Sequence, residues 1–221
     1  APLGWPSTPA LPHSALRRFR ELIWELVVEG IVVVGQNDES TNWPFLSLTE
    51  YGEEVLEQGP PQPYDPDGYL ATLSAARPLD SVELRYIPQA LTCFRRGVPD
   101  AAAVMLGAAS EHLILRLANE IADADANIAA SLRAKLRGNA LPIQVEVRKY
   151  FDLYRAKLPR DLQESVGTTF SAIADSIRIA RNEAGHPVFP AMTREQVFVN
   201  LQLFPLYRRW VIGASKCLPI T

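Results

Sequence analysis

The sequence has little of several features that would assign a function directly. Among its 221 residues there are two cysteines, Cys93 and Cys217, and three histidines. The cysteines lie far apart in the chain and match no metal-binding or redox spacing, so neither a structural zinc site nor a disulfide framework is expected. Free thiols of this kind are typical of a reducing cytoplasm, and we predict no metal and no cofactor.

An excess of positive charge and a long apolar run are also missing. The formal net charge is −3, so no global basic field would draw the molecule onto nucleic acid, and any such contact needs a local patch. No run approaches the roughly 18 apolar residues that span a bilayer. The N-terminus lacks the charged and then apolar layout of a secretion signal. We therefore expect a cytoplasmic protein that makes no membrane contact.

The chain does have the apolar content of a folded protein, since 48% of its residues are hydrophobic. That content can bury a substantial core in one domain, or in one domain with a small appendage. The opening residues 1–13 are rich in proline without periodicity, and residue 1 is Ala rather than Met. We expect an irregular lead over 1–13, and we interpret the chain as a piece of something longer.

Residues 14–58 alternate between helical and strand patterns. Ser14 can cap a helix whose apolar residues recur at helical spacing until Gly30 stops it. The segments 31–35 and 43–48 then predict two strands around a polar tip, and Thr49 caps a short helix that runs to residue 58. The predicted order is helix, strand, tip, strand, helix.

This order resembles the end of a winged helix-turn-helix. The stretch ELVVEGIVVVG followed by WPFLSLTEYGEEVL is similar to that family's recognition helix, wing and trailing helix, although the two helices that should come first are absent. The resemblance implies DNA contact by Arg17, Arg18 and Arg20, and a solvated helix face is the alternative. The tip 36–42 holds Asp38 and Glu39 and no cation, which argues against a DNA-gripping wing and favours dimerisation or protein docking.

The rest of the chain is predicted to be helical after a linker. Residues 59–80 are rich in proline at the start, and we interpret them as a stiff linker. From residue 81 onward the pattern predicts a bundle of four to five helices over 81–221, with a polar insertion at about 123–160. Pro99 opens the second of these helices and Thr193 caps the last. The fold class is therefore mainly α, preceded by a small α+β module with a two-stranded wing.

The stretch RNEAGHP, residues 181–187, ends the third long helix of this bundle. On an unbroken helix Arg181 and His186 would point to different sides. Gly185 tolerates the left-handed conformation that ends helices, and Pro187 disfavours a helical His186. We expect the chain to turn over at Gly185 and bring the imidazole back toward the guanidinium. The pair is either a helix cap, which the macrodipole favours, or a catalytic pair.

A bundle whose third long helix ends in Arg181, Asn182, and then His186 after four intervening positions resembles the HEPN superfamily. The helix GVPDAAAVMLGAASEHLILRLANEI is also similar to that superfamily's second helix, and the resemblance spans about residues 81–217. It implies a metal-independent endoribonuclease of toxin or defence type that acts as a homodimer and leaves 2′,3′-cyclic phosphate. It also implies an antitoxin or regulatory partner. The superfamily includes members that bind nucleotides or only dimerise.

Physical chemistry agrees with these residue types. Cleavage of RNA through its own 2′-hydroxyl needs a base, an acid, and positive donors for the phosphate oxygens. Arg181 offers a fixed fork of donors, His186 titrates near neutrality, and Asn182 can orient the imidazole or bind phosphate. One subunit supplies one histidine at this site, so a twofold axis past the helix ends would provide both the acid and the base.

Further residues are candidates for a supporting role. Glu111 follows Val104, Gly107 and Ala108 at helical spacing, so it can face the bundle and pair with Arg181, or else lie in solvent. Possible nucleic-acid contacts, each of which can equally be a solvated surface charge, are Arg17, Arg18, Arg20, Arg148, Lys149, Arg208 and Arg209. A second reading of the whole chain stays open, in which a non-catalytic dimer regulates or binds nucleic acid or protein through the winged-helix-like module.

Overall fold

The computed structural model describes residues 12–35, 40, 43, 45–58, 62–136 and 140–219. The described chain is mainly helical, with a small two-stranded antiparallel sheet, as the sequence predicts. It divides into two compact units, Ala1–Pro61 and Gln62–Thr221. Most of the predicted lead 1–13 and most of the predicted tip 36–42, with Asp38 and Glu39, lie outside the described residues.

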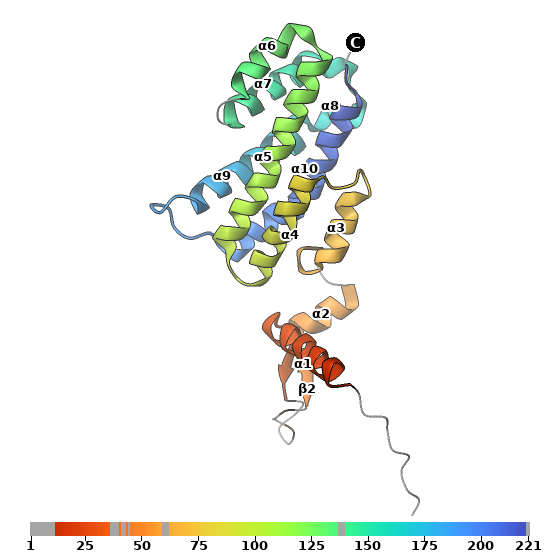
Figure 1. Ribbon diagram of the computed structural model, residues 1–221, viewed down its shortest axis with the longest axis vertical. Helices are drawn as coiled ribbons and strands as arrows, with labels where there is room; N and C mark the ends of the chain where they lie inside the picture. The colour runs from red at the N-terminus through yellow and green to blue at the C-terminus, as the bar shows by residue number, and fades with distance from the viewer. Residues whose placement is uncertain are drawn as a thin grey trace, which may run out of the picture. The chain divides into compact units, whose positions relative to one another are not determined.

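The first unit has the predicted order of elements. Its elements are α1 (His13–Val28), β1 (Val32–Val34), β2 (Leu46–Leu48) and α2 (Glu50–Gln58) (Figure 1). The strands pair antiparallel with Val33 opposite Ser47. This arrangement gives a helix, a two-stranded ribbon and a second helix.

Local chemistry fixes the ends of these elements. Gly30 takes the left-handed φ of 72° that stops α1, as expected. The hydroxyl of Thr49 donates to the Gly30 carbonyl at 2.5 Å and accepts from the Gly52 N–H at 2.9 Å, so it caps α2 and ties it to the end of α1. Ser14, in contrast, is not a cap. It lies inside α1, whose N-cap position is Pro12 and which therefore has no side-chain cap.

The second unit begins at Gln62, so the prediction of a linker over 59–80 is wrong beyond Pro61. A short 3-10 turn, Gln62–Tyr64, leads into α3 (Pro66–Ser74), which Asp65 caps by accepting from the Gly68 N–H at 3.0 Å. Tyr69 is fully buried, and its hydroxyl donates to the Leu201 carbonyl at 2.7 Å. This segment is therefore part of the helical core.

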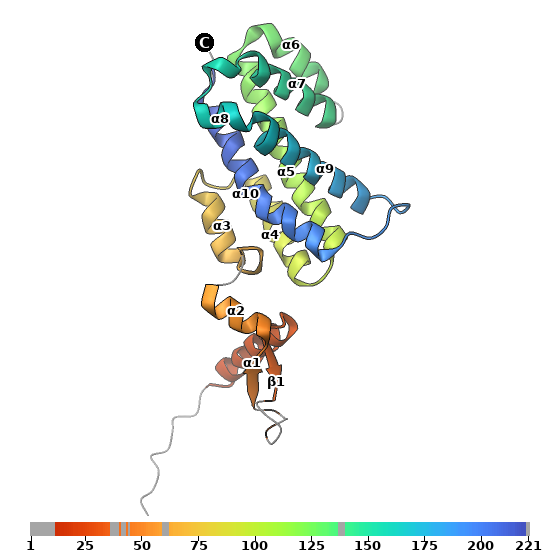
Figure 2. The same ribbon diagram turned by 180° about the vertical axis from the view of Figure 1, so that it is seen from behind.

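Four long helices form the body of this unit. They are α4 (Ser81–Arg95), α5 (Pro99–Ala124), α9 (Ile173–Ala184) and α10 (Arg194–Lys216), and α5 packs against each of the others (Figures 1 and 2). Pro99 and Thr193 open α5 and α10 as predicted. Within the described residues α5 alone is long and apolar enough to cross a membrane, which the sequence interpretation had not anticipated. Since 56% of its apolar window is buried in the bundle, core packing accounts for that composition.

The predicted insertion is part of the helical bundle, because its helices pack onto α5. Helices α6 (Ala126–Lys135) and α7 (Ala140–Leu153) lie together at one end of α5, where Leu132 and Ile143 are completely buried (Figure 2). A 3-10 turn and the short helix α8 (Arg160–Ser165) follow. A π-helical segment, Val166–Ala172, then separates α8 from α9.

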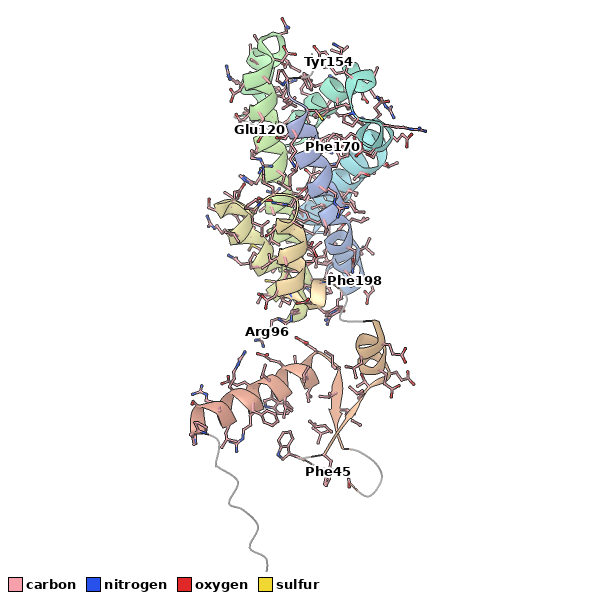
Figure 3. All side chains as sticks on the ribbon, turned by 90° about the vertical axis from the view of Figure 1, so that its right-hand side faces the viewer. Phe45, Arg96, Glu120, Tyr154, Phe170 and Phe198 are labelled. Atoms are coloured by element: carbon pink, nitrogen blue, oxygen red, sulfur yellow. The ribbon has the colours of Figure 1, made fainter. Side chains whose placement is uncertain are left out.

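Aromatic packing joins the π-helical segment to α10. Phe170, labelled in Figure 3, is buried, and its ring stacks on Trp210 with centroids 4.5 Å apart and on Tyr207 with centroids 6.2 Å apart. Phe151 on α7 meets the edge of Trp210 at 5.2 Å. These contacts hold α7 and the segment before α9 against the last helix, which fixes where α9 starts.

Candidate functional site

The end of α9 presents the predicted catalytic residues to solvent. Ile177 and Ala180 are buried against the bundle, whereas Arg181 and Asn182 in the last turn are exposed. Gly185 has φ −85° and ψ −1°, so the expected left-handed reversal at this glycine is wrong. Gly185 instead keeps a right-handed conformation. In this conformation its N–H donates to the Arg181 carbonyl at 3.1 Å and closes the last turn of α9.

Arg181, Asn182 and His186 nevertheless share one surface depression. They line it together with Val104 and Gly185, and its volume is about 450 Å³. The imidazole of His186 is exposed and meets the Phe189 ring edge-on, with centroids 6.0 Å apart. The loop that carries His186 projects away from the neighbouring helices of its unit (Figures 1 and 2). The three side chains are therefore open to a ligand or to a second protein surface.

Arg181 is held in place from two sides. Its aliphatic stem lies directly against Gly107 of α5, where a Cβ would overlap it. Its Nη1 donates to Asn182 Oδ1 at 3.1 Å, and its Nη2 donates to Glu111 Oε2 at 3.5 Å. The predicted pairing of Glu111 with Arg181 is thus present, as a partly exposed ion pair. The guanidinium points to Glu111 and Asn182, so Arg181 and His186 share the depression without a direct bond.

A second hollow adjoins the first and shares Arg181 and Asn182 with it. It encloses about 370 Å³ between α5, α7 and α9. Its remaining wall residues are Gly107, Ser110, Glu111, Ile114, Leu141, Gln144, Ala174 and Arg178. Sequence reasoning missed Gln144 and Arg178. Arg178 precedes Arg181 by one helical turn, which is a usable signal, whereas Gln144 comes from the supposed insertion and carried none.

Arg208 has a structural position, so its predicted contact with nucleic acid is wrong. The side chain is completely buried, and its Nε donates to Glu83 Oε1 at 2.6 Å. Its Nη1 and Nη2 donate to the carbonyls of Leu73 at 2.5 Å and Arg77 at 3.0 Å, which fixes α10 to α4 and the end of α3. Arg209, the next residue, is exposed and stays a candidate.

Tyr207, the residue before Arg208, is buried as well. Its hydroxyl donates to the Ser110 carbonyl at 3.3 Å. Burial raises the pKa of this phenol above its ordinary value, and the contact with Ser110 offsets that only in part. Tyr207 therefore has a packing role and presents no face to a base.

The other predicted cations lie on helix surfaces beside acidic residues. Arg148 is 3.6 Å from Asp152, and Lys149 is 3.1 Å from Glu146, whose pKa is lowered by hydrogen bonds from Lys135 and Lys149. In the first unit, Arg17 and Arg18 both pair with Glu21, at 3.0 Å and 3.7 Å. Arg20 borders an apolar hollow that Ile23, Trp24, Val27, Val34 and Trp43 complete. These local pairs offset much of the positive charge, so none of these helices forms an uncompensated basic stripe.

One further observation concerns metal binding. Within the described part of the chain, no group of three or more His, Cys, Asp or Glu side chains is arranged to hold a metal ion. The functional groups at the end of α9 are a guanidinium, an amide, a carboxylate and an imidazole. That set can bind an anion and move a proton.

Comparison with known proteins adds one distant similarity. No family model matches the chain, and no solved structure matches it. The chain is similar to Sharpin from Homo sapiens, with 28% identity over 223 residues that cover 99% of this chain and 49% of Sharpin. The chain thus spans about half the length of that curated relative. An activity for this chain has to be argued from its own residues.

Proposed function

We propose that the helical unit is a metal-independent endoribonuclease of toxin or defence type, acting as a homodimer with a composite site of Arg181, Asn182 and His186. The observation that carries the proposal is that these three side chains line one exposed depression at the end of α9. Glu111 and Gly107 hold Arg181 there. The resemblance to the HEPN superfamily supplies the reaction class.

The residues suit cleavage by the 2′-hydroxyl of RNA. A base takes the proton of that hydroxyl, its oxygen attacks the phosphorus, and the bond to the 5′-oxygen breaks as an acid protonates the leaving group. The products are a 2′,3′-cyclic phosphate and a free 5′-hydroxyl. The forked donors of Arg181 match the equatorial phosphate oxygens, which gain charge in the transition state.

A second copy of the chain completes the site in this proposal. One subunit brings one imidazole to the depression, and the reaction needs a base and an acid. A twofold axis past the projecting loop would bring the partner's imidazole to the other side of the same phosphate. Exposure of the whole loop 186–190 leaves room for that approach.

The test is RNA cleavage by the purified full chain in excess EDTA, with end-group analysis of the fragments. We expect cyclic phosphate ends, and loss of about 100-fold or more in rate for Arg181→Ala and His186→Ala, since each removes a transition-state contact. Arg85→Ala is the matched control, because Arg85 is an exposed arginine on α4 that does not line the depression, and this variant should cleave like the wild type. Unchanged cleavage by both site variants, or cleavage that EDTA abolishes, would overturn the proposal.

One observation favours the alternative of a non-catalytic dimeric regulatory or binding protein. In the first unit α1 buries none of its residues, and Phe19, Trp24 and Trp43 are 56%, 64% and 52% exposed. Apolar aromatic exposure of this kind suits docking onto protein more than onto DNA. Under this alternative, Trp24→Ala removes partner binding, whereas His186→Ala changes no measured property.

A further inference from the structure

Gln144 and Arg178 form a polar wall of the hollow between α5, α7 and α9, and both bond the carboxylate of Asp175, which does not itself line the hollow. Asp175 Oδ1 accepts from Gln144 Nε2 at 3.2 Å and from Arg178 Nη2 at 3.0 Å. An ionised carboxylate can only accept hydrogen bonds. The amide of Gln144 therefore turns its nitrogen to Asp175 and its oxygen away from it.

Two polar atoms of this wall are buried and have no partner among the described residues. They are Oε1 of Gln144, an acceptor, and Nε of Arg178, a donor. Gln144 is 5% exposed, so leaving its carbonyl unpaired is costly unless a ligand donates to it. Gln144 and Arg178 both line the hollow, so it offers one unpaired acceptor and one unpaired donor. A ligand whose edge carries a donor next to an acceptor would pair with both.

The rest of the hollow favours a flat and mostly neutral ring over a second phosphate. Ile114 and Leu141 give it apolar walls. The charges of Arg178 and Arg181 are matched by those of Asp175 and Glu111, so no net positive charge is available for another anion. A nucleobase has apolar faces and an edge of donors and acceptors, which fits both the walls and the unpaired atoms.

We propose that this hollow, the base pocket, binds one nucleobase of the RNA whose phosphate Arg181 holds. Arg181 and Asn182 line both the base pocket and the depression with His186, so a nucleotide seated there has its phosphate beside the reacting groups. Both atoms are covered by their neighbours, so binding includes a rotation of each side chain, after which Gln144 Oε1 accepts from an N–H on the base edge and Arg178 Nε donates to a ring nitrogen or carbonyl. The inference rests on the proposed function for the identity of its ligand.

The experiment is calorimetric titration of the full chain with AMP, GMP, CMP and UMP, and with ribose 5-phosphate as the probe that lacks a base. We expect at least one nucleotide to bind about tenfold or more tightly than ribose 5-phosphate. Gln144→Leu should weaken that nucleotide about tenfold, as the loss of a buried hydrogen bond does, and leave ribose 5-phosphate unchanged. Equal binding of the nucleotides and ribose 5-phosphate, or no binding of either, overturns the base pocket.

A second variant covers the chance that a change at the buried Gln144 disturbs folding. Leu141 is 43% exposed at the pocket wall, and Leu141→Trp obstructs the pocket without removing a hydrogen bond. Leu153→Trp is its matched control, because Leu153 lies on the same helix, is 75% exposed and does not line the pocket. We expect Leu141→Trp to lose nucleotide binding and Leu153→Trp to keep it. Wild-type binding by Leu141→Trp counts against the pocket.

The two proposals can fail separately. If nucleotide binding depends on Gln144 but the chain cuts no RNA, the base pocket is supported and the ribonuclease proposal is contradicted. If Gln144→Leu and the wild type cleave RNA with the same base preference, the ribonuclease proposal is supported and the base pocket is contradicted.

Discussion

Gly107 on α5 lies so close beneath Arg181 on α9 that a Cβ at position 107 would overlap the Cβ and Cγ of the arginine. The two helices can therefore meet at this point only because residue 107 has no side chain. Gly107 is buried, and it lies one helical turn from Glu111, the ion-pair partner of Arg181. Packing and charge thus act together to set the position of a single guanidinium.

The first prediction concerns Gly107→Ala. Its new methyl group has to push α9 away from α5, so we expect a loss of about 1–3 kcal/mol in the free energy of unfolding, the usual cost of overpacking. Urea denaturation followed by circular dichroism measures this. RNA cleavage should fall as well, since Arg181 moves with its helix.

The control for this variant is Gly213→Ala. A Cβ on Gly213 of α10 would meet only the Leu162 side chain at ordinary distances of 3.4 Å and more. Alanine also favours helix over glycine by about 1 kcal/mol. We expect Gly213→Ala to be neutral or stabilising, and equal losses at both positions would contradict the role given to the Gly107 contact.

The second prediction is that Glu111→Gln separates catalysis from stability. Both partners of the ion pair are about a third or more exposed, at 34% for Glu111 and 45% for Arg181, so its loss should change the free energy of unfolding by less than about 1 kcal/mol. Arg181 loses the charge that orients its fork, and we expect kcat to fall about tenfold. Steady-state cleavage kinetics beside thermal melting measure both effects. A large drop in melting temperature would assign Glu111 to the fold and not to positioning.

The third prediction is that Arg208→Met destabilises the second unit by about 3–5 kcal/mol, because it leaves the carboxylate of Glu83 buried without its main partner. The double variant Glu83→Gln with Arg208→Met should recover part of that loss, since a neutral amide is cheaper to bury than a charge. Chemical denaturation of the single variants Arg208→Met and Glu83→Gln and of the double variant gives the coupling. A double variant as unstable as the sum of its two single changes would show that the charge pair is not the cause.

Part of this network could be predicted from the sequence. Arg208 follows Phe204 by four residues and precedes Val211 by three, which is the spacing of the buried face of α10. Glu83 likewise precedes the buried Ile87 by four. Each charge therefore occupies an apolar position, a pattern that indicates a buried pair, but which of the many acids partners Arg208 depends on how α4 and α10 pack.

Periodicity and caps located the four long helices α4, α5, α9 and α10, whereas α3 and the conformation at Gly185 were not predicted. The segment after Pro61 contains Asp65 as a cap and Tyr69 and Leu73 one turn apart, yet its prolines favoured the reading as a linker. Gly185 permits a left-handed turn but does not require one, and the structure keeps it right-handed. Propensity allows several conformations at such residues, and only tertiary packing selects between them.

The base pocket was beyond sequence reasoning for a similar reason. Its polar wall joins Gln144 of α7 to Asp175 and Arg178 of α9 through hydrogen bonds between residues far apart in the chain. The predicted insertion gave no reason to place α7 against α9. Arg181 and His186, in contrast, are near neighbours in sequence, so their shared depression could be anticipated even though the conformation that produces it was not.

The last prediction concerns acid stability through Asp80, which joins α4 to α5. Its Oδ1 accepts from the N–H groups of Val82 and Glu83, both at 3.0 Å, and its Oδ2 is 2.8 Å from His112 Nε2 and 3.3 Å from Arg116 Nη1. Burial raises the pKa of this carboxyl, but the hydrogen bonds from Glu83, His112 and Val82 and the charge of His112 together outweigh burial and lower it. A carboxyl with a lowered pKa in the folded state stabilises the fold above its unfolded pKa of about 4 and loses that contribution as the pH falls through its folded pKa.

Asp80→Asn isolates this charge, because asparagine is also a good helix N-cap. We expect the variant to be less stable than the wild type at pH 7, and the gap in urea midpoint to narrow as the pH is lowered from about 4 toward 2. Asp152→Asn, an exposed carboxyl 3.6 Å from Arg148, serves as the control and should show almost no gap at any pH. A gap for Asp80→Asn that stays constant from neutral to acid pH would mean that the variant disturbs the cap and not the charge, since only the charge can titrate.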